Sequence, residues 1–515
     1  MLSGREERYP ERPMAMAAST APIAPPLTPS RQNHLLVLAV ILIALFALRE
    51  LSLAMSATSL GFDEAQYWAW AQDLAFGYST KPPLIAWLIA GTTSLCGDGM
   101  VCVRLPANLL HIASAALLYV AGRQFYDWRV GFWSAVFYAT MPATAVSSYL
   151  ITTDVPLIVF WCIALIVFHV HANAPRLLTG VVLGLALGIG LNAKYAMIFF
   201  VPCAALYILF TPRAWAVARA PSTWLALVIG AALIAPNVLW NLSNGFATLD
   251  HTVSDNMEWQ GLILHPKDML EFIGTQFGML GPVIFGAYLV ILATGRRTQK
   301  PEEDRFLLFM SLPVFLLITF QALMSQAEAN WSATAFPAAV VLVAAHLTMP
   351  RHRTSFIWSL SVNGAVAAVI LFGMMLMTPS IVPPRLLKPV YQIFGGEDLR
   401  QGLIATLDKT ELNTVVVQGR TLTAEVIYAL RGTRYDVRAY LKSETAPAHD
   451  FERIRPWTPD MPLPIAFVRS KASGAPDFLP GRKSIIGKVD SPSLGIRYGV
   501  LDVWKVEAED TGEGD

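Results

Sequence analysis

The sequence has few charged residues and few cysteines. Asp, Glu, Lys and Arg make up 15% of its 515 residues, whereas hydrophobic residues make up 54% and the mean hydropathy is +0.48. An ordinary soluble protein is neither so apolar nor so poor in charge, so the composition excludes that class. Also missing are an internal repeat, a Gly-rich phosphate loop and a D-x-D pair, of which the last two would indicate a nucleotide site. The composition predicts a polytopic membrane protein.

The four cysteines divide into two pairs. Cys162 and Cys203 fall within apolar stretches, where cysteine behaves as a small apolar residue. Cys96 and Cys102 share the first outer loop, where an oxidising compartment would allow a disulfide. Spacing alone does not establish the geometry of a bridge, so the sequence leaves this pairing open.

About eleven apolar stretches approach the length of roughly 17–25 residues that a membrane-spanning helix needs. The fifth and sixth stretches are short and close together. The expected spans are His34–Met55, Leu105–Gly122, Val130–Leu150, Val155–His171, Leu177–Leu191, Tyr195–Phe210, Trp224–Trp240, Met269–Thr294, Phe306–Leu323, Trp331–Leu347 and Phe356–Met377. We therefore expect an all-α membrane domain of about eleven transmembrane helices.

Basic residues gather in alternate loops, which marks those loops as cytoplasmic. They are Arg123 and Arg129, Arg176, Arg213 and Arg219, then Arg296, Arg297, Lys300 and Arg305, and finally Arg351 and Arg353. The opposite loops carry only Lys81, Arg104, Lys194 and Lys267. With an odd number of spans, this alternation predicts a cytoplasmic N-terminus and a periplasmic C-terminus.

Composition divides the chain into three parts. Residues 1–33 are rich in Pro, Ala and Ser and predict a disordered cytoplasmic tail. Residues 34–378 form the transmembrane domain, with a first periplasmic loop at 57–104. Residues 379–515 predict a small periplasmic α/β domain. Its expected elements are strands at Thr414–Gln418, Tyr435–Tyr440, Pro464–Arg469 and Tyr498–Val506 and a helix at Thr423–Arg431.

Polar residues collect at the outer ends of the predicted helices, whereas the inner loops are short and carry mostly arginine. The outer groups are Asp63, Glu64, Tyr78 and Lys81; Thr152, Thr153 and Asp154; Asn192 and Lys194; Asn237, Asn241, Asp250, His251 and Asp255; and Gln326, Glu328 and Asn330. This asymmetry indicates chemistry or recognition on the outer face.

Each of these groups also has a purely structural explanation. Asp63 and Asp154 can cap helices, and Lys81 can extend its amine to the lipid head groups. Arg49 and Glu50 can neutralise one another within the first helix. Taken together, however, two outer lysines suit the phosphate of a lipid carrier. A carboxylate beside them can accept a proton from an attacking hydroxyl.

The motifs D-E-A-Q-Y-W-x-W, G-Y-x-x-K-P-P-L, V-R-L-P, T-D-V-P, A-K-Y-A and A-N-W occur in that order between Asp63 and Trp331. Through them the chain resembles the protein O-mannosyltransferase and lipid A aminoarabinose transferase family from about Leu35 to Met349. These are membrane glycosyltransferases of the GT-C fold that use polyprenyl-phosphate sugars. The resemblance implies that Asp63 and Asp154 are the catalytic carboxylates. It implies that Tyr78, Lys81 and Lys194 hold the donor phosphate.

Glu64 and Arg49 are expected to support the site. Two positions depart from the aminoarabinose transferases, which have an arginine where this chain has Gln66 and a glutamate where it has Thr80. The resemblance makes that glutamate a metal ligand, and this chain lacks it. We therefore do not predict a bound metal or another cofactor, and the sequence leaves a divalent metal open. The loss of both charges suggests a different donor sugar or acceptor.

The expected activity is inverting transfer of a sugar from a polyprenyl phosphate to lipid A or lipopolysaccharide at the periplasmic face of a bacterial inner membrane. Core oligosaccharide, another envelope glycan and a protein hydroxyl are chemically compatible acceptors. The expected partners are the donor, the acceptor and membrane lipids, with no nucleic acid. A transporter or flippase of a lipid-linked sugar is the alternative, but transporters tend to have related halves and midplane polar residues. A non-catalytic assembly subunit is a further alternative.

Overall fold

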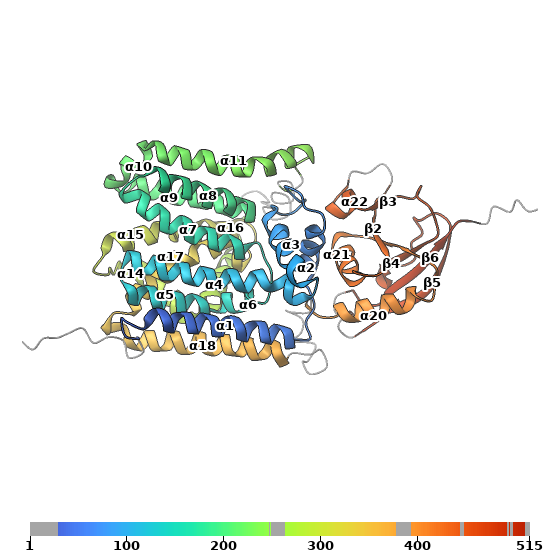
Figure 1. Ribbon diagram of the computed structural model, residues 1–515, viewed down its shortest axis with the longest axis horizontal. Helices are drawn as coiled ribbons and strands as arrows, with labels where there is room; N and C mark the ends of the chain where they lie inside the picture. Colours follow the sequence, from blue (N-terminus) through green and yellow to red (C-terminus); the bar gives the residue numbers. More distant parts are fainter. Residues whose placement is uncertain are drawn as a thin grey trace, which may run out of the picture.

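The computed structural model describes residues 29–246, 248, 263–376, 393–442, 447–491, 494 and 498–509. Long helices form a bundle, and a small sheet with its own helices forms a second unit beyond one end of it (Figure 1). Helices α2 (Phe62–Ala71) and α3 (Leu84–Cys96) lie between the two units (Figure 1). This mainly helical architecture with a C-terminal sheet agrees with the expected fold class. Most of the expected tail, 1–33, lies outside the described residues.

The remaining helices of the bundle follow the apolar stretches of the sequence. They are α1 (His34–Met55), α4 (Met100–Phe125), α5 (Trp128–Thr140), α6 (Pro142–Ser147), α7 (Asp154–Asn173), α8 (Leu177–Ala193), η1 (Tyr195–Phe199), α9 (Phe200–Leu209), η2 (Pro212–Ala214), α10 (Trp215–Arg219), α11 (Pro221–Ser243), α13 (Pro266–Leu280), α14 (Pro282–Thr294), α15 (Pro301–Phe309), α16 (Leu312–Met324), η3 (Ala329–Ala335), α17 (Phe336–Leu347), η4 (Pro350–His352) and α18 (Arg353–Leu376).

Within the described residues, seven helical segments are long and apolar enough to cross a membrane. The bent pair Tyr195–Leu209 and Pro212–Arg219 makes an eighth if it counts as one span. Shorter apolar helices at Leu84–Cys96, Leu177–Ala193 and Pro282–Thr294 do not meet that length. The expected count of about eleven spans therefore stays a prediction.

Several of the expected spans are each divided between two helices, among them Met269–Thr294 and Val130–Leu150. The stretch Met269–Thr294 divides into α13 and α14 at Gly281, whose φ of 92° suits glycine, and a Cβ there would collide with Asn363. The stretch Val130–Leu150 divides into α5 and α6 before Pro142. Proline pushes the preceding residue away from helical backbone angles, so an apolar stretch need not be one continuous helix.

The core of the bundle centres on α17, whose twelve residues are all buried. A helix that is apolar on every side belongs in the interior of a protein, surrounded by other helices. Cys162 and Cys203 are buried free thiols, in line with their expected apolar role.

The C-terminal sheet has six strands in the order β3-β2-β1-β4-β6-β5. Strands β1, β2, β3 and β4 run parallel, and β6 pairs antiparallel with β4 and β5. The bounds are β1 (Thr414–Val417), β2 (Asp436–Tyr440), β3 (Pro456–Trp457), β4 (Ile465–Ser470), β5 (Arg482–Val489) and β6 (Leu501–Glu507), with helices α20 (Gly396–Leu407), α21 (Arg420–Ala429) and α22 (Asp450–Ile454) and the short η6 (Lys471–Ser473). The four expected strands and the helix are present, whereas β3 and β5 were not expected: β3 has only two residues, and lysine, serine and glycine interrupt the alternation of β5.

Candidate active site

Asp154 is held by side chains from two other loops. It is the first residue of α7, and its carboxylate oxygens accept from Lys194 Nζ at 2.7 Å and from Asn330 Nδ2 at 2.7 Å. Lys194 directly follows α8, and Asn330 lies in η3. The structure thus brings together three of the polar groups expected at the outer helix ends. With both oxygens occupied, Asp154 is fixed in orientation.

Glu64 is a buried connection between two loops. Arg104 donates to Glu64 through Nε at 2.8 Å and Nη2 at 2.6 Å. The backbone N–H of Gly61 donates to Oε2 at 2.9 Å and that of Ile151 to Oε1 at 3.0 Å. Glu64 therefore ties the start of α2, which carries Asp63, to the segment that leads to Asp154. Arg104 was expected only as part of a motif, with no role assigned.

The two positions that depart from the aminoarabinose transferases contact each other. The side-chain amide of Gln66 donates to Thr80 Oγ1 at 3.1 Å, and both residues are buried. The pair joins α2 to the residue before Lys81. The arginine and the glutamate of the aminoarabinose transferases are thus replaced at two positions that contact each other. Because both charges are lost together, neither replacement leaves a charge without its partner.

Lys81 is half-buried next to this contact. Its backbone carbonyl accepts from the N–H of Tyr78 at 3.3 Å, but its side-chain amine has no hydrogen bond or ion pair among the described residues. Burial lowers the pKa of its amine, as does the charge of Lys194, while Asp63 and Asp154 raise it. These charges lie close enough to act on one another, so the structure brings both predicted aspartates and both predicted lysines into one site.

Tyr78 is buried, and its hydroxyl contacts the backbone of its own loop. Its hydroxyl donates to the carbonyls of Trp70 and Asp73 and accepts from the N–H of Ala75, each at 3.1 Å. Its ring stacks on the ring of Trp70, with 4.4 Å between the ring centroids. Burial raises the pKa of Tyr78 to about 12, so the hydroxyl stays protonated. Its partners show a role in shaping the loop, and a role in holding phosphate stays a prediction.

Arg49 lies away from this group. Its side chain is buried, and Nη2 donates to the carbonyl of Ala139 at 2.6 Å. The neighbouring Glu50 accepts from Asn108, so the two residues bond to different partners instead of neutralising one another. Within the described part of the chain, Arg49 and Lys81 share no contact, and the supporting role of Arg49 stays a prediction.

The C-terminal domain closes one side of the site, which the sequence did not reveal. Asp450 in α22 accepts from Ser79 N and Oγ at distances between 2.7 and 3.0 Å, two residues before Lys81. Helix α21 packs along α2, with Tyr428 against Trp68 at 5.0 Å between ring centroids. The first residue of α21, Arg420, also contributes to the lowered pKa of Lys81.

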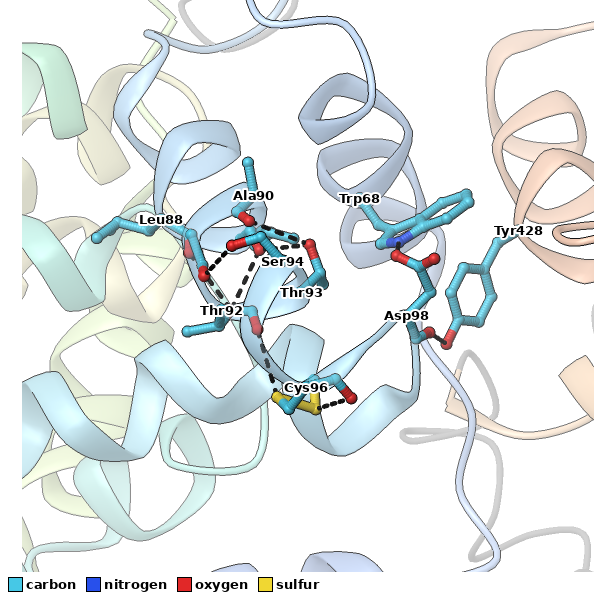
Figure 2. The surroundings of a disulfide bond; sticks show 12 residues. Trp68, Leu88, Ala90, Thr92, Thr93, Ser94, Cys96, Asp98 and Tyr428 are labelled. Carbon is cyan, nitrogen blue, oxygen red and sulfur yellow. Dashed lines mark hydrogen bonds between the residues drawn. A yellow bond between two sulfur atoms is a disulfide. The ribbon is translucent and has the colours of Figure 1, made fainter.

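A disulfide joins Cys96 to Cys102, which answers the question that the sequence left open. The loop that it closes contains Asp98. Figure 2 shows that Asp98 lies between Trp68 and Tyr428. The carboxylate accepts from the indole of Trp68 at 2.8 Å, and the backbone carbonyl accepts from the hydroxyl of Tyr428 at 3.0 Å. This loop therefore fastens the C-terminal domain to α2.

The described residues of this site do not assemble a set of metal ligands, and the expectation about a metal stays a prediction. Within the described ranges, no group of three or more His, Cys, Asp or Glu residues is placed to hold an ion. The two oxygens of Asp154 are occupied by cationic and amide donors, and Thr80 stands at the position of the expected ligand. Asp250, His251 and Asp255 lie outside the described residues.

Three comparisons identify similar proteins. Residues 80–240 match the family described as dolichyl-phosphate-mannose-protein mannosyltransferase. The lipid A galacturonosyltransferase RgtD of Rhizobium johnstonii is 33% identical over 397 residues, which cover 76% of this chain and 82% of that protein. The lipopolysaccharide core galacturonosyltransferase RgtA of the same organism is 26% identical over 277 residues, or 51% of this chain and 55% of that protein.

Among solved structures, ArnT from Cupriavidus metallidurans has the same fold. Its apo structure matches with a TM-score of 0.65 at 12% identity and covers 92% of this chain and 98% of ArnT. The structure bound to undecaprenyl phosphate gives 0.64 at 14% identity with the same coverage. The fold, the RgtD match and the mannosyltransferase-family match agree, and they favour the expected enzyme over a transporter. The chain is a multi-pass membrane protein and a member of the GT-C glycosyltransferase family that includes the lipid A galacturonosyltransferase RgtD.

Proposed function

We propose that the protein transfers a sugar from a polyprenyl phosphate to lipid A at the periplasmic face of a bacterial inner membrane. The names of RgtD and RgtA support a lipid A or lipopolysaccharide acceptor and indicate galacturonic acid as the sugar. The likeness to an ArnT structure that holds undecaprenyl phosphate supports the class of carrier.

The observation that carries this proposal is half-buried Lys81 beside Asp63, Asp154 and Lys194, because its amine has no hydrogen bond or ion pair within the part of the chain that the structure describes. Withdrawing an ammonium group from water without a counterion costs free energy. An anionic ligand recovers that cost, so the site is prepared for one before the ligand arrives. Lys194 is already paired with Asp154, which makes Lys81 the principal partner for phosphate.

The charge on the carrier changes during transfer. A polyprenyl-phosphate sugar is a phosphodiester with one negative charge, and breaking its bond to the anomeric carbon releases a monoester that approaches two at neutral pH. Lys81 therefore interacts more strongly with the leaving group than with the substrate. Donors placed where charge develops lower the barrier, since they stabilise the transition state more than the ground state.

Asp63 is proposed to accept the proton of the acceptor hydroxyl. It lies in the first turn of α2, held in place through the Glu64 contacts. The acceptor oxygen attacks the anomeric carbon from the face opposite the phosphate, the bond from carbon to phosphate oxygen breaks, and the configuration inverts. Asp154, fixed by Lys194 and Asn330, orients Lys194 toward the phosphate. An acceptor that is itself a phosphate would need no base, and Asp63 would then only position it.

The periplasmic placement is supported by the disulfide. Disulfides persist in oxidising compartments, and Cys96 and Cys102 lie in the loop that contains the site. Fusing alkaline phosphatase, which is active only in the periplasm, to the C-terminus tests this. An active fusion is expected, and an inactive one would reverse the proposed orientation.

The function is tested by mass spectrometry of lipid A and polyprenyl-phosphate sugars from cells with and without the intact gene. A sugar missing from lipid A, with its lipid-linked form accumulating, is the expected result. Complementation with Asp63→Asn or Lys81→Ala should lower transfer by roughly 100-fold or more. The exposed Lys409→Ala variant is the control and should restore transfer. Unchanged lipid A in the deletion strain would refute the proposal.

A further inference from the structure

A third cation reaches the site from the C-terminal domain. Arg420 is the first residue of α21, and α21 packs along α2, whose first turn carries Asp63. Ala65 and Tyr67 of α2 share a buried apolar cluster with Ala424 of α21, which fixes the two helices against each other.

The charge of Arg420 affects the same ionisable groups as the charges of the site. Burial is the main reason why the pKa of Lys81 is lowered, and the charge of Arg420 contributes to that lowering. Burial raises the pKa of Tyr67, Asp63 and Asp154 add to the rise, and Arg420 opposes it. Arg420 therefore acts on the same groups as the two aspartates.

Arg420 has no protein partner in the described parts of the chain, although it is half-buried. Other arginines of this domain are engaged: Arg453 pairs with Asp450, Arg400 donates to the carbonyl of Ala429, and Arg431 lies over the ring of Tyr428. Within the described residues, Arg420 and Lys81 are thus two half-buried cations whose side chains have no hydrogen-bonded counterion, and each can bind an anionic group of a ligand.

We propose that Arg420 binds the carboxylate of a uronic acid donor and so selects an acidic sugar over its neutral counterpart. This inference rests on the proposed function and extends it to the sugar. A polyprenyl-phosphate uronic acid carries a phosphate at the anomeric carbon and a carboxylate across the ring. Lys81 takes the first group and Arg420 the second. The planar guanidinium matches a carboxylate with two parallel hydrogen bonds, which a lysine amine cannot reproduce.

The C-terminal domain is held firmly enough to present such a residue. Asp450 binds Ser79, and Tyr428 binds the carbonyl of Asp98 in the disulfide loop. Both contacts join the domain to the first loop, on which Asp63 and Lys81 lie. With Arg420 as carboxylate ligand, the C-terminal domain contributes to sugar binding, and specificity for the sugar can change there while the phosphate site stays the same.

The test compares two donors that differ only at this group, polyprenyl-phosphate galacturonic acid and polyprenyl-phosphate galactose, with lipid A as acceptor. The full-length protein is reconstituted in vesicles, and kcat/KM is measured for both donors. Wild type should prefer the acidic donor. Arg420→Gln should lose roughly 10- to 100-fold on the acidic donor, mainly through KM, and less than about threefold on the neutral one. Arg420→Lys should lie between. Arg482→Gln, an exposed change in the same domain, is the control.

Equal losses on both donors would overturn the inference, because Arg420 would then act on the phosphate or on the fold. A loss that appears only with phosphorylated lipid A, for either donor, would also overturn it and assign Arg420 to the acceptor. Wild type that transfers only galactose would overturn the inference and leave the proposed transferase intact. Transfer from neither donor would refute the proposed function, and this inference with it. Should Arg420→Gln fail to fold, Arg420→Lys still decides, since a preference for the acid as strong as that of wild type would contradict bidentate binding.

Discussion

Replacing Glu64 with glutamine should destabilise the protein without altering its chemistry directly. The side chains of Glu64 and Arg104 are 5% and 0% exposed, and the carboxylate accepts two bonds from Arg104 and two from backbone N–H groups. Glutamine removes the charge that compensates Arg104 and turns an amide N–H₂ toward groups that are themselves donors. Breaking a buried ion pair in this way costs about 3–5 kcal/mol.

Two further variants separate this structural effect from catalysis. Asp63→Asn is the same chemical change one residue earlier, so it should abolish transfer while lowering the unfolding temperature much less. Glu64→Leu combined with Arg104→Met removes both charges and should be more stable than either single variant, since no charge is left buried alone. Thermal unfolding of the detergent-solubilised protein and transfer in vesicles are measured on the same samples.

The reasoning would be refuted by a Glu64→Gln protein that unfolds at the wild-type temperature yet transfers no sugar. Glu64 would then act on the reactants, and its contacts with Arg104 would be incidental to the fold. A double variant less stable than both single variants would contradict the assignment of the loss to an uncompensated charge.

Three other changes test separate features of the site. Cys96→Ser should lower stability by about 1–3 kcal/mol by opening the loop that fastens the C-terminal domain, and reductant should then have no further effect on unfolding. Burial and two nearby arginines lower the pKa of His449 to about 4 despite Glu452 at 3.3 Å. The unfolded state therefore protonates first, and stability should fall by up to about 3 kcal/mol as pH drops from 7 toward 4; the thermal stability of His449→Gln should depend less on pH. Tyr78→Phe should lower stability by about 1–2 kcal/mol with an unchanged donor KM, and a raised KM would instead support the phosphate role.

Sequence reasoning could single out the carboxylates and lysines as candidates because their signal is local. Asp63 and Asp154 each follow a loop and begin a helix, and Lys81 and Lys194 are basic residues on the side where such residues are rare. Those patterns can be read from neighbours in the chain. The contacts among Asp154, Lys194 and Asn330 could be predicted only in part. The basic-residue pattern places all three on the same side of the membrane, but it does not predict their hydrogen bonds.

Contacts across the fold left no such signal. Arg104 could be read as an outer basic residue, but nothing in V-R-L-P shows that it reaches Glu64 forty positions earlier. Gln66 and Thr80 were interpreted as two separate losses of charge that pointed to a different donor or acceptor. Since they bond to each other, they form one coupled replacement, and their neutrality alone says little about the sugar.

The evidence on the sugar lies instead in the domain that had no readable motif. The sequence predicted the helix at Thr423–Arg431. Its packing against α2, however, depends on Tyr428, Trp68 and the loop closed by Cys96. None of these signals recognition when read alone. Their combined effect is to carry Arg420 to a site whose other charges come from the membrane domain. Motifs of the membrane domain are thus enough to propose the phosphate site. The proposed choice of sugar depends on the packing of α21 against α2, which only the three-dimensional structure shows.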